Sequence, residues 1–168
     1  ELIPSGKQPS SPYDSVFDAS SHVILPGLIN LHHHFYQTLT RVFPQALNKE
    51  LFPWLQTLYP IWEGLTPESL RLGTRLALAE LLLSECTTAS DHHYVFRNGL
   101  EKAIDLQIEE AEALGIRVVL CRGSMDRSQK DGGLPTDSVV QTFDEILEDS
   151  QRLIQTYHDS NHGAMTQI

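Results

Sequence analysis

The stretch GLINLHHH at residues 27–34 decides the fold: a short apolar run that ends in three histidines. The apolar run over residues 23–25 is too short for a helix, and Pro26 would break one, so the sequence predicts a strand, a turn at Pro26-Gly27 and then a buried strand. Side chains two residues apart on a strand point to the same side, so we expect His32 and His34 to converge and His33 to point away. Two convergent imidazoles supply half of a metal site. Hydrogen-bonded histidines without a metal are the alternative, because a His-x-His pair alone is a weak signal.

Strands and helices alternate along the rest of the chain. Strands are expected over residues 23–25, 86–93, 115–120 and 164–168, and helices over residues 66–84, 100–114 and 143–157. The first helix has a hydroxyl N-cap at Thr66 and a proline at its first position, and Gly115 suits a left-handed cap after the second. This alternation is typical of βαβ units around a parallel sheet, so the predicted fold class is α/β, in a barrel or an open sheet. A flavodoxin-like open sheet is disfavoured, because no glycine-rich phosphate loop follows the first strand.

Composition excludes several classes of partner. The 168 residues suit one domain, and a formal net charge of -10 argues against binding to a nucleic acid polymer. No apolar run is long enough to span a bilayer and the first residues resemble no secretion signal, so we expect no membrane partner and a cytoplasmic location. Cys86 and Cys121 lie far apart without CxxC spacing, which predicts two reduced, mostly buried thiols.

Five short motifs carry a resemblance to a known family. PGLINLHHH at residues 26–34 resembles the opening of the amidohydrolase superfamily. HFYQ at residues 34–37 resembles its deaminase branch, which includes the guanine and 8-oxoguanine deaminases. Further similarity to that branch lies in LNKELFPWL at 47–55, which resembles the loop after its first strand, and in DHHY at 91–94 and RGSM at 122–125. This chain is therefore identified as the amino-terminal portion of a member of this family.

The resemblance implies the first half of a metal-dependent hydrolase (β/α)8 barrel of the TIM type. Residues 1–25 would be a remnant of the small amino-terminal β domain, and residues 26–168 the first four or so β/α units, whereas a whole barrel needs about 250 residues. The family takes its other metal ligands and its proton-shuttling glutamate from later strands, so no catalytic acid or base is assigned in this chain. The end strands of a half-barrel are open edges, which predicts association with a second copy or with a missing carboxyl-terminal half.

The resemblance also assigns residues to the site. His32 and His34 match the metal-ligand motif, for a divalent metal with zinc preferred. Gln37 matches a glutamine that contacts the purine through its amide donor and acceptor. Trp54 is expected as a wall of the substrate pocket, with an ordinary core aromatic as the alternative.

Two further residues follow the next predicted strands. His92 ends the second strand at the same barrel face and is expected to line the pocket, unless it is a structural histidine. Arg122 follows the third strand and is expected to recognise a carbonyl or an anionic ring, unless it forms a salt bridge instead.

The implied function is hydrolytic deamination of an aminopurine such as 8-oxoguanine, with release of ammonia, by a longer protein. The substrate is then a small heterocycle. Two alternatives stay open: a related amidohydrolase or chlorohydrolase that acts on triazine or pyrimidine rings, and a catalytically inactive half-barrel.

One residue departs from the family pattern. Members of the family commonly have glycine at the position of Glu85, in the turn after the leucine-rich helix. If the backbone there is left-handed, glutamate costs roughly 1 kcal/mol of stability.

Overall fold

The computed structural model describes residues 3–4, 6–10, 12–158 and 166–168. Four strands form one sheet in the order β1-β2-β3-β4, and each neighbouring pair is parallel. The strands are β1 (Leu28–Asn30), β2 (Cys86–His93), β3 (Arg117–Arg122) and β4 (Thr166–Gln167). The parallel α/β architecture predicted from the sequence is therefore confirmed. Of the strand expected over residues 164–168, residues 164 and 165 lie outside the described residues.

Four α-helices accompany the sheet in the described part of the chain. They are α1 (Leu51–Trp62), α2 (Pro67–Leu83), α3 (Ala103–Leu114) and α4 (Phe143–Tyr157). The last three confirm the predicted helices. The prediction of a loop over residues 47–55 was wrong from Leu51 onward, where α1 begins. This helix forms although it includes two prolines, and it buries Leu58, Tyr59 and Trp62. Tertiary burial of one face stabilises α1 against unfavourable local signals.

The helix ends follow the local sequence. The Thr66 hydroxyl accepts a hydrogen bond from the Ser69 amide at 3.1 Å, and the Ser69 hydroxyl accepts one from the Thr66 amide at 2.8 Å, which closes a capping box at the start of α2. Gly115 ends α3 in the left-handed conformation, with φ of 73°. Glu85 lies between α2 and β2 with φ of 62°, so its backbone is left-handed.

Replacing Glu85 with glycine should stabilise the protein. Glycine adopts a positive φ without the steric clash that a side chain causes, so we expect Glu85→Gly to raise the free energy of unfolding by about 0.5–1 kcal/mol. Urea denaturation of the two proteins measures the difference. Glu112→Gly within α3 is the opposite control, since glycine inside a helix is destabilising. A loss of stability in Glu85→Gly would show that its side chain makes a stabilising contact stronger than the backbone strain.

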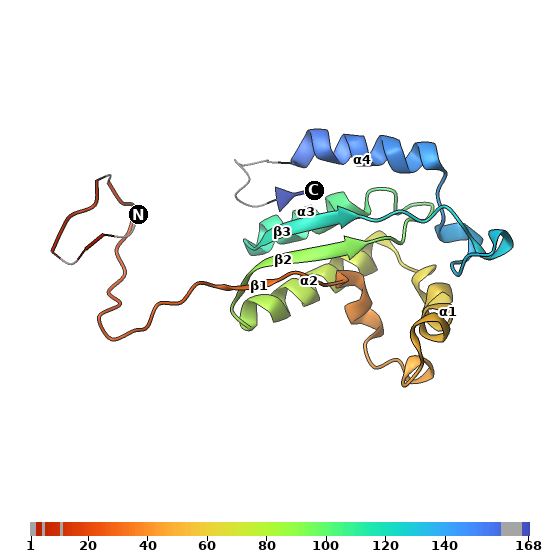
Figure 1. The fold of residues 1–168 in the computed structure, drawn as a ribbon, viewed down its shortest axis with the longest axis horizontal. Helices are drawn as coiled ribbons and strands as arrows, with labels where there is room; N and C mark the ends of the chain where they lie inside the picture. Colours follow the sequence, from red (N-terminus) through yellow and green to blue (C-terminus); the bar gives the residue numbers. More distant parts are fainter. Residues whose placement is uncertain (1–2, 5, 11, 159–165) are drawn as a thin grey trace.

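One face of the sheet is covered and the other is open. Helices α2 and α3 pack behind the sheet in Figure 1, and Ala89, Asp91 and His93 of β2 are buried on that side. The alternate residues of β2, among them Ser90 and His92, point to the other face and are partly or fully exposed. Because parallel sheets are usually covered on both faces, the open face is what a partial barrel would present.

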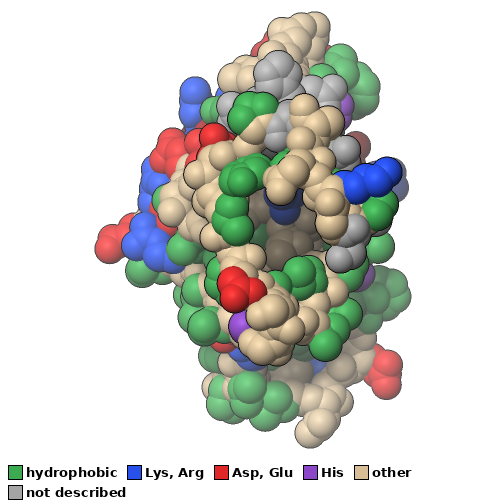
Figure 2. All heavy atoms as spheres, turned by 90° about the vertical axis from the view of Figure 1, so that its left-hand side faces the viewer, with side chains coloured by type: hydrophobic (Ala, Val, Ile, Leu, Met, Phe, Trp, Pro, Cys, Tyr) green, Lys and Arg blue, Asp and Glu red, His purple; other side chains and the backbone are tan. Residues whose placement is uncertain are grey.

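The amino-terminal arm lies apart from this sheet. Its described residues before Leu28 contain no helix or strand, and the strand predicted over residues 23–25 was wrong, since these side chains are 77–86% exposed. A groove of about 660 Å³ is lined by residues of the arm and of the start of the sheet. Figure 2 views the molecule from the side of the arm and shows hydrophobic side chains around a hollow. The division of the chain at residue 25 stays a prediction.

Two remaining expectations concern thiols and membranes. Cys86 is buried as expected, but Cys121 is exposed, because β3 turns it to the open face of the sheet. Among the helices of the described residues, none combines the length and the apolar character needed to cross a bilayer.

Candidate active site

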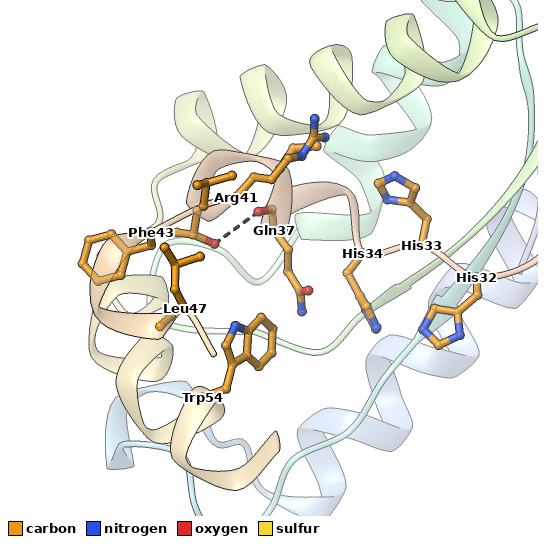
Figure 3. A pocket seen from close by; sticks show the side chains of 12 residues that line it. His32, His33, His34, Gln37, Arg41, Phe43, Leu47 and Trp54 are labelled. Atoms are coloured by element: carbon orange, nitrogen blue, oxygen red, sulfur yellow. Dashed lines mark hydrogen bonds between the residues drawn. The ribbon is translucent and has the colours of Figure 1, made fainter. Parts of the chain in front are cut away.

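The three histidines lie just past the end of β1. The strand itself ends at Asn30, so the histidines are not within it as predicted; they form an extended connection to a 3-10 helix over Phe35–Thr40. The alternation of side chains nevertheless persists. The rings of His32 and His34 have centroids 5.3 Å apart, and Figure 3 shows His33 on the opposite side of the chain. The predicted convergence of the two histidines is therefore present.

A hydrogen bond fixes the chemical state of His34. Its Nδ1 lies 2.7 Å from the backbone oxygen of His92, and a carbonyl only accepts, so Nδ1 carries the proton. The lone pair of Nε2 is then available, as in histidines that bind metals. Burial lowers the pKa of His34, and the neighbouring charges of His92 and His32 add to this effect. The neutral imidazole that a metal requires is thus favoured.

The end of β2 holds the histidine segment in place. The backbone N–H of His92 donates to the oxygen of His33 at 3.0 Å. The His92 side chain lines a pocket of about 280 Å³, together with His32, His34 and the exposed Cys121. Its ring centroid lies 5.8 Å from that of His34. His92 is therefore beside the predicted metal ligands, where its assigned role stays a prediction.

His93 points the other way, into the core. It is fully buried, and its Nε2 donates to the Val95 carbonyl oxygen at 2.8 Å. Burial lowers its pKa from 6.5 to about 4. The neutral ring is a structural part of the core beneath the site.

Stability should depend on the protonation of His93. Its pKa is lower in the folded state, so its contribution is complete above pH 6.5 and is lost as the pH falls toward 4. The shift corresponds to about 3 kcal/mol. Burial raises the pKa of Asp91 to about 7, so protonation of Asp91 favours the folded state as the pH falls and opposes the effect of His93. The quantity to measure is therefore the difference in unfolding free energy between the wild type and His93→Gln. That difference should fall by about 3 kcal/mol from pH 7 to pH 4; a constant difference would contradict a buried neutral His93.

The histidine segment also lines a second pocket, whose volume of about 440 Å³ is within the range of ligand pockets. It is lined by His32, His33, His34, Gln37, Thr38, Thr40, Arg41, Val42, Phe43, Ala46, Leu47 and Trp54, which Figure 3 draws as sticks. Gln37 and Trp54 thus share one pocket with both predicted ligands. The ring of Trp54 rests against that of the buried Trp62, with centroids 5.5 Å apart. Trp54 therefore lines this pocket, and its role as a wall of a substrate pocket stays a prediction.

Two tyrosines hold the Gln37 amide. Its Nε2 donates to the hydroxyl of Tyr94 at 3.0 Å and to that of Tyr36 at 3.3 Å. Both donor positions of the amide are engaged, which leaves its carbonyl oxygen to meet a ligand. This differs from the expectation that donor and acceptor would both face the ring.

Arg122 is engaged elsewhere. Its Nε lies 3.1 Å from Asp149, its second amino group donates to Gln141 at 2.5 Å, and its guanidinium carbon lies 4.0 Å from the centre of the Phe96 ring. The side chain is 2% exposed. The structure matches the salt-bridge alternative, and a substrate contact would require these interactions to break.

Sequence reasoning did not predict the contacts of Asp91 and of the two tyrosines. Asp91 is 1% exposed within β2, and a carboxyl group at an inward-facing position of a predicted strand was a usable signal. Tyr94 directly follows His93, and Tyr36 comes two residues after His34, but only the fold shows that the two tyrosines meet at Gln37. In the described part of the chain, no three histidine, cysteine or acidic side chains gather into a metal-binding group.

Comparison with known proteins places this geometry in a family. The model of the amidohydrolase family matches residues 23–168. The whole chain is 60% identical to 8-oxoguanine deaminase from Pseudomonas aeruginosa and covers 37% of that protein. Over 160 residues it is 37% identical to an isoxanthopterin deaminase from an unknown prokaryotic organism and covers 33% of it.

A solved structure extends the comparison to the fold. Atrazine chlorohydrolase from Arthrobacter aurescens TC1, complexed with zinc, superposes with a TM-score of 0.76 at 32% identity. The alignment covers 86% of this chain and 33% of the chlorohydrolase. The chain thus spans little more than a third of the relatives it matches, as part of a barrel-type hydrolase fold. With a family model that matches nearly all of its length, the chain belongs to the amidohydrolase family.

Proposed function

We propose that the protein containing this chain is a metal-dependent hydrolase that removes an amino group from an aminopurine such as 8-oxoguanine. The observation that carries the proposal is the convergence of His32 and His34, with Nε2 of His34 left available. The 60% identity to 8-oxoguanine deaminase supports this substrate class over the triazine rings of more distant relatives.

Each residue has a part in the proposed reaction. His32 and His34 would hold a divalent metal, most simply zinc, and further ligands would come from outside this chain. When bound, such a metal makes a water molecule more acidic and so supplies a nucleophile near neutral pH. Gln37 would orient the ring by accepting a hydrogen bond from a ring N–H, and Trp54 would cover a face of the ring.

The test measures both the metal content and the ammonia release of the longest protein that the source DNA encodes. We expect about one or two metal ions per chain and ammonia from 8-oxoguanine in preference to guanine, isoxanthopterin and cytosine. The His32→Ala, His34→Ala double variant is the matched control for any contaminating deaminase. Turnover of a triazine ring alone would favour the alternative substrate class, and a protein that binds metal but turns over none of these rings would contradict the deaminase proposal.

The 168-residue chain is assayed in parallel. We propose that it does not complete the site by itself, because only two ligands converge in its described part. Activity of the chain alone would mean that a second copy supplies the missing ligands. Self-association and a cytoplasmic location stay predictions from the sequence.

A further inference from the structure

A carboxylate is buried beneath the histidine segment. Asp91 is 1% exposed, and its side chain points from β2 into the layer covered by the helices. Its hydrogen-bond donors are neutral amides rather than cations. Burying a carboxyl group in this way is unfavourable unless its hydrogen bonds are made, so the contacts of Asp91 point to its role.

The two oxygens of Asp91 join different parts of the fold. Oδ1 accepts a hydrogen bond from the backbone N–H of Phe35 at 2.5 Å. Oδ2 accepts one from Nε2 of Gln107, a fully buried residue of α3, at 2.8 Å. Phe35 directly follows His34, so the carboxylate anchors the backbone at the exit of the histidine segment. Helix α3, which contributes nothing to the pockets around the histidines, is thereby connected to them.

Neighbouring hydrogen bonds hold the two residues just before Phe35. The N–H of His92 holds the oxygen of His33, and the oxygen of His92 holds Nδ1 of His34. Together with Asp91, the end of β2 thus fixes the segment at three consecutive residues. Loss of the Phe35 bond would free the segment at one end, and the ring of His34 would lose its defined direction.

We propose that Asp91, held by Gln107, is a positioning residue that sets the geometry of His32 and His34 for metal binding. This inference rests on the proposed function. Asp91 touches neither pocket and acts only through the backbone of Phe35. Groups that orient metal ligands in this indirect way commonly change metal affinity by about 10–100-fold when they are removed.

The Gln107 amide predicts which substitution is tolerated. Its Oε1 is buried and has no hydrogen-bond partner. In Asp91→Asn, Oδ1 still accepts from Phe35, and a rotated Gln107 amide offers Oε1 to the new Nδ2 donor. Asparagine should therefore preserve the anchor, whereas alanine removes it.

The experiment measures zinc affinity by competition titration on the full-length protein, for the wild type, Asp91→Ala, Asp91→Asn and Asp105→Ala. Asp105 is the matched control: it is a buried carboxylate of α3 that pairs with Arg152 at 2.6 Å, away from the histidines. We expect Asp91→Ala to weaken zinc binding at least 10-fold, and the other two variants to stay within about threefold of the wild type. Equal zinc affinity in Asp91→Ala and the wild type would overturn the proposal.

Hydrogen exchange of the Phe35 amide, measured without metal, provides a test that does not depend on the proposed function. We expect exchange at Phe35 to be at least 10-fold faster in Asp91→Ala than in the wild type, and unchanged in Asp91→Asn and Asp105→Ala. Equal acceleration in Asp105→Ala would show that Asp91 contributes only to the general stability of the protein, and it would contradict a positioning role. If the wild type binds no zinc, the proposed function fails, while the exchange rates still decide whether Asp91 anchors the segment.

Discussion

Metal binding is expected to disappear when His32 and His34 are both replaced by alanine in the full-length protein, with deaminase activity falling at least 1000-fold, as expected for loss of the metal that activates water. The two rings converge, and they are the ligands that this chain offers to the proposed site. His33→Ala should change zinc affinity less than 10-fold, because its ring points away from the other two and its Nδ1 has no hydrogen-bond partner.

The double variant should still fold. His32 is exposed and His34 partly exposed, so the main structural loss is the hydrogen bond from Nδ1 of His34 to the His92 oxygen, which is worth about 1 kcal/mol. Metal analysis, circular dichroism and thermal melting of the three proteins separate the two effects. Equal loss of metal in His33→Ala and in the double variant would contradict the alternation of side chains and the assignment of His32 and His34.

Trp62→Ala is expected to cost about 3–5 kcal/mol of stability, a large share of the total for a small domain. The side chain is 1% exposed, and its ring lies 5.2 Å from that of Tyr36 and 5.7 Å from that of Tyr59, between centroids. Its Nε1 also donates to the Thr40 hydroxyl at 3.1 Å. Removal leaves a cavity and breaks this hydrogen bond where α1 meets the pocket.

Two variants test whether this loss comes from the cavity. Trp62→Phe keeps an aromatic ring but loses the hydrogen bond, so it should cost about 1–2 kcal/mol. Phe52→Ala alters the same helix at a side chain that is 63% exposed and should stay within about 0.5 kcal/mol. Urea unfolding with an unchanged denaturant slope is the measurement. A loss below 1 kcal/mol in Trp62→Ala would mean that α1 contributes little to folding.

Local patterns in the sequence predicted much of the fold. The α2 cap at Thr66, the left-handed Gly115 and the alternation along β2 depend on neighbours a few residues away, so they can be read directly from the chain. Helix α1 could not be read in this way. Its prolines and absent caps argue against a helix, and the burial of Trp62 that stabilises it depends on residues distant in sequence.

The sequence by itself determined the family, the parallel α/β class and the pairing of His32 with His34, because a strand period and a short motif are local properties. Only the tertiary structure decided the partners of the polar side chains. It pairs Arg122 with Asp149, turns Cys121 to the open face, joins Gln37 to two tyrosines and places Asp91 beneath Phe35. These pairings depend on which residues the βαβ crossovers bring together. A buried polar side chain forms its hydrogen bond with whichever partner the packing places beside it.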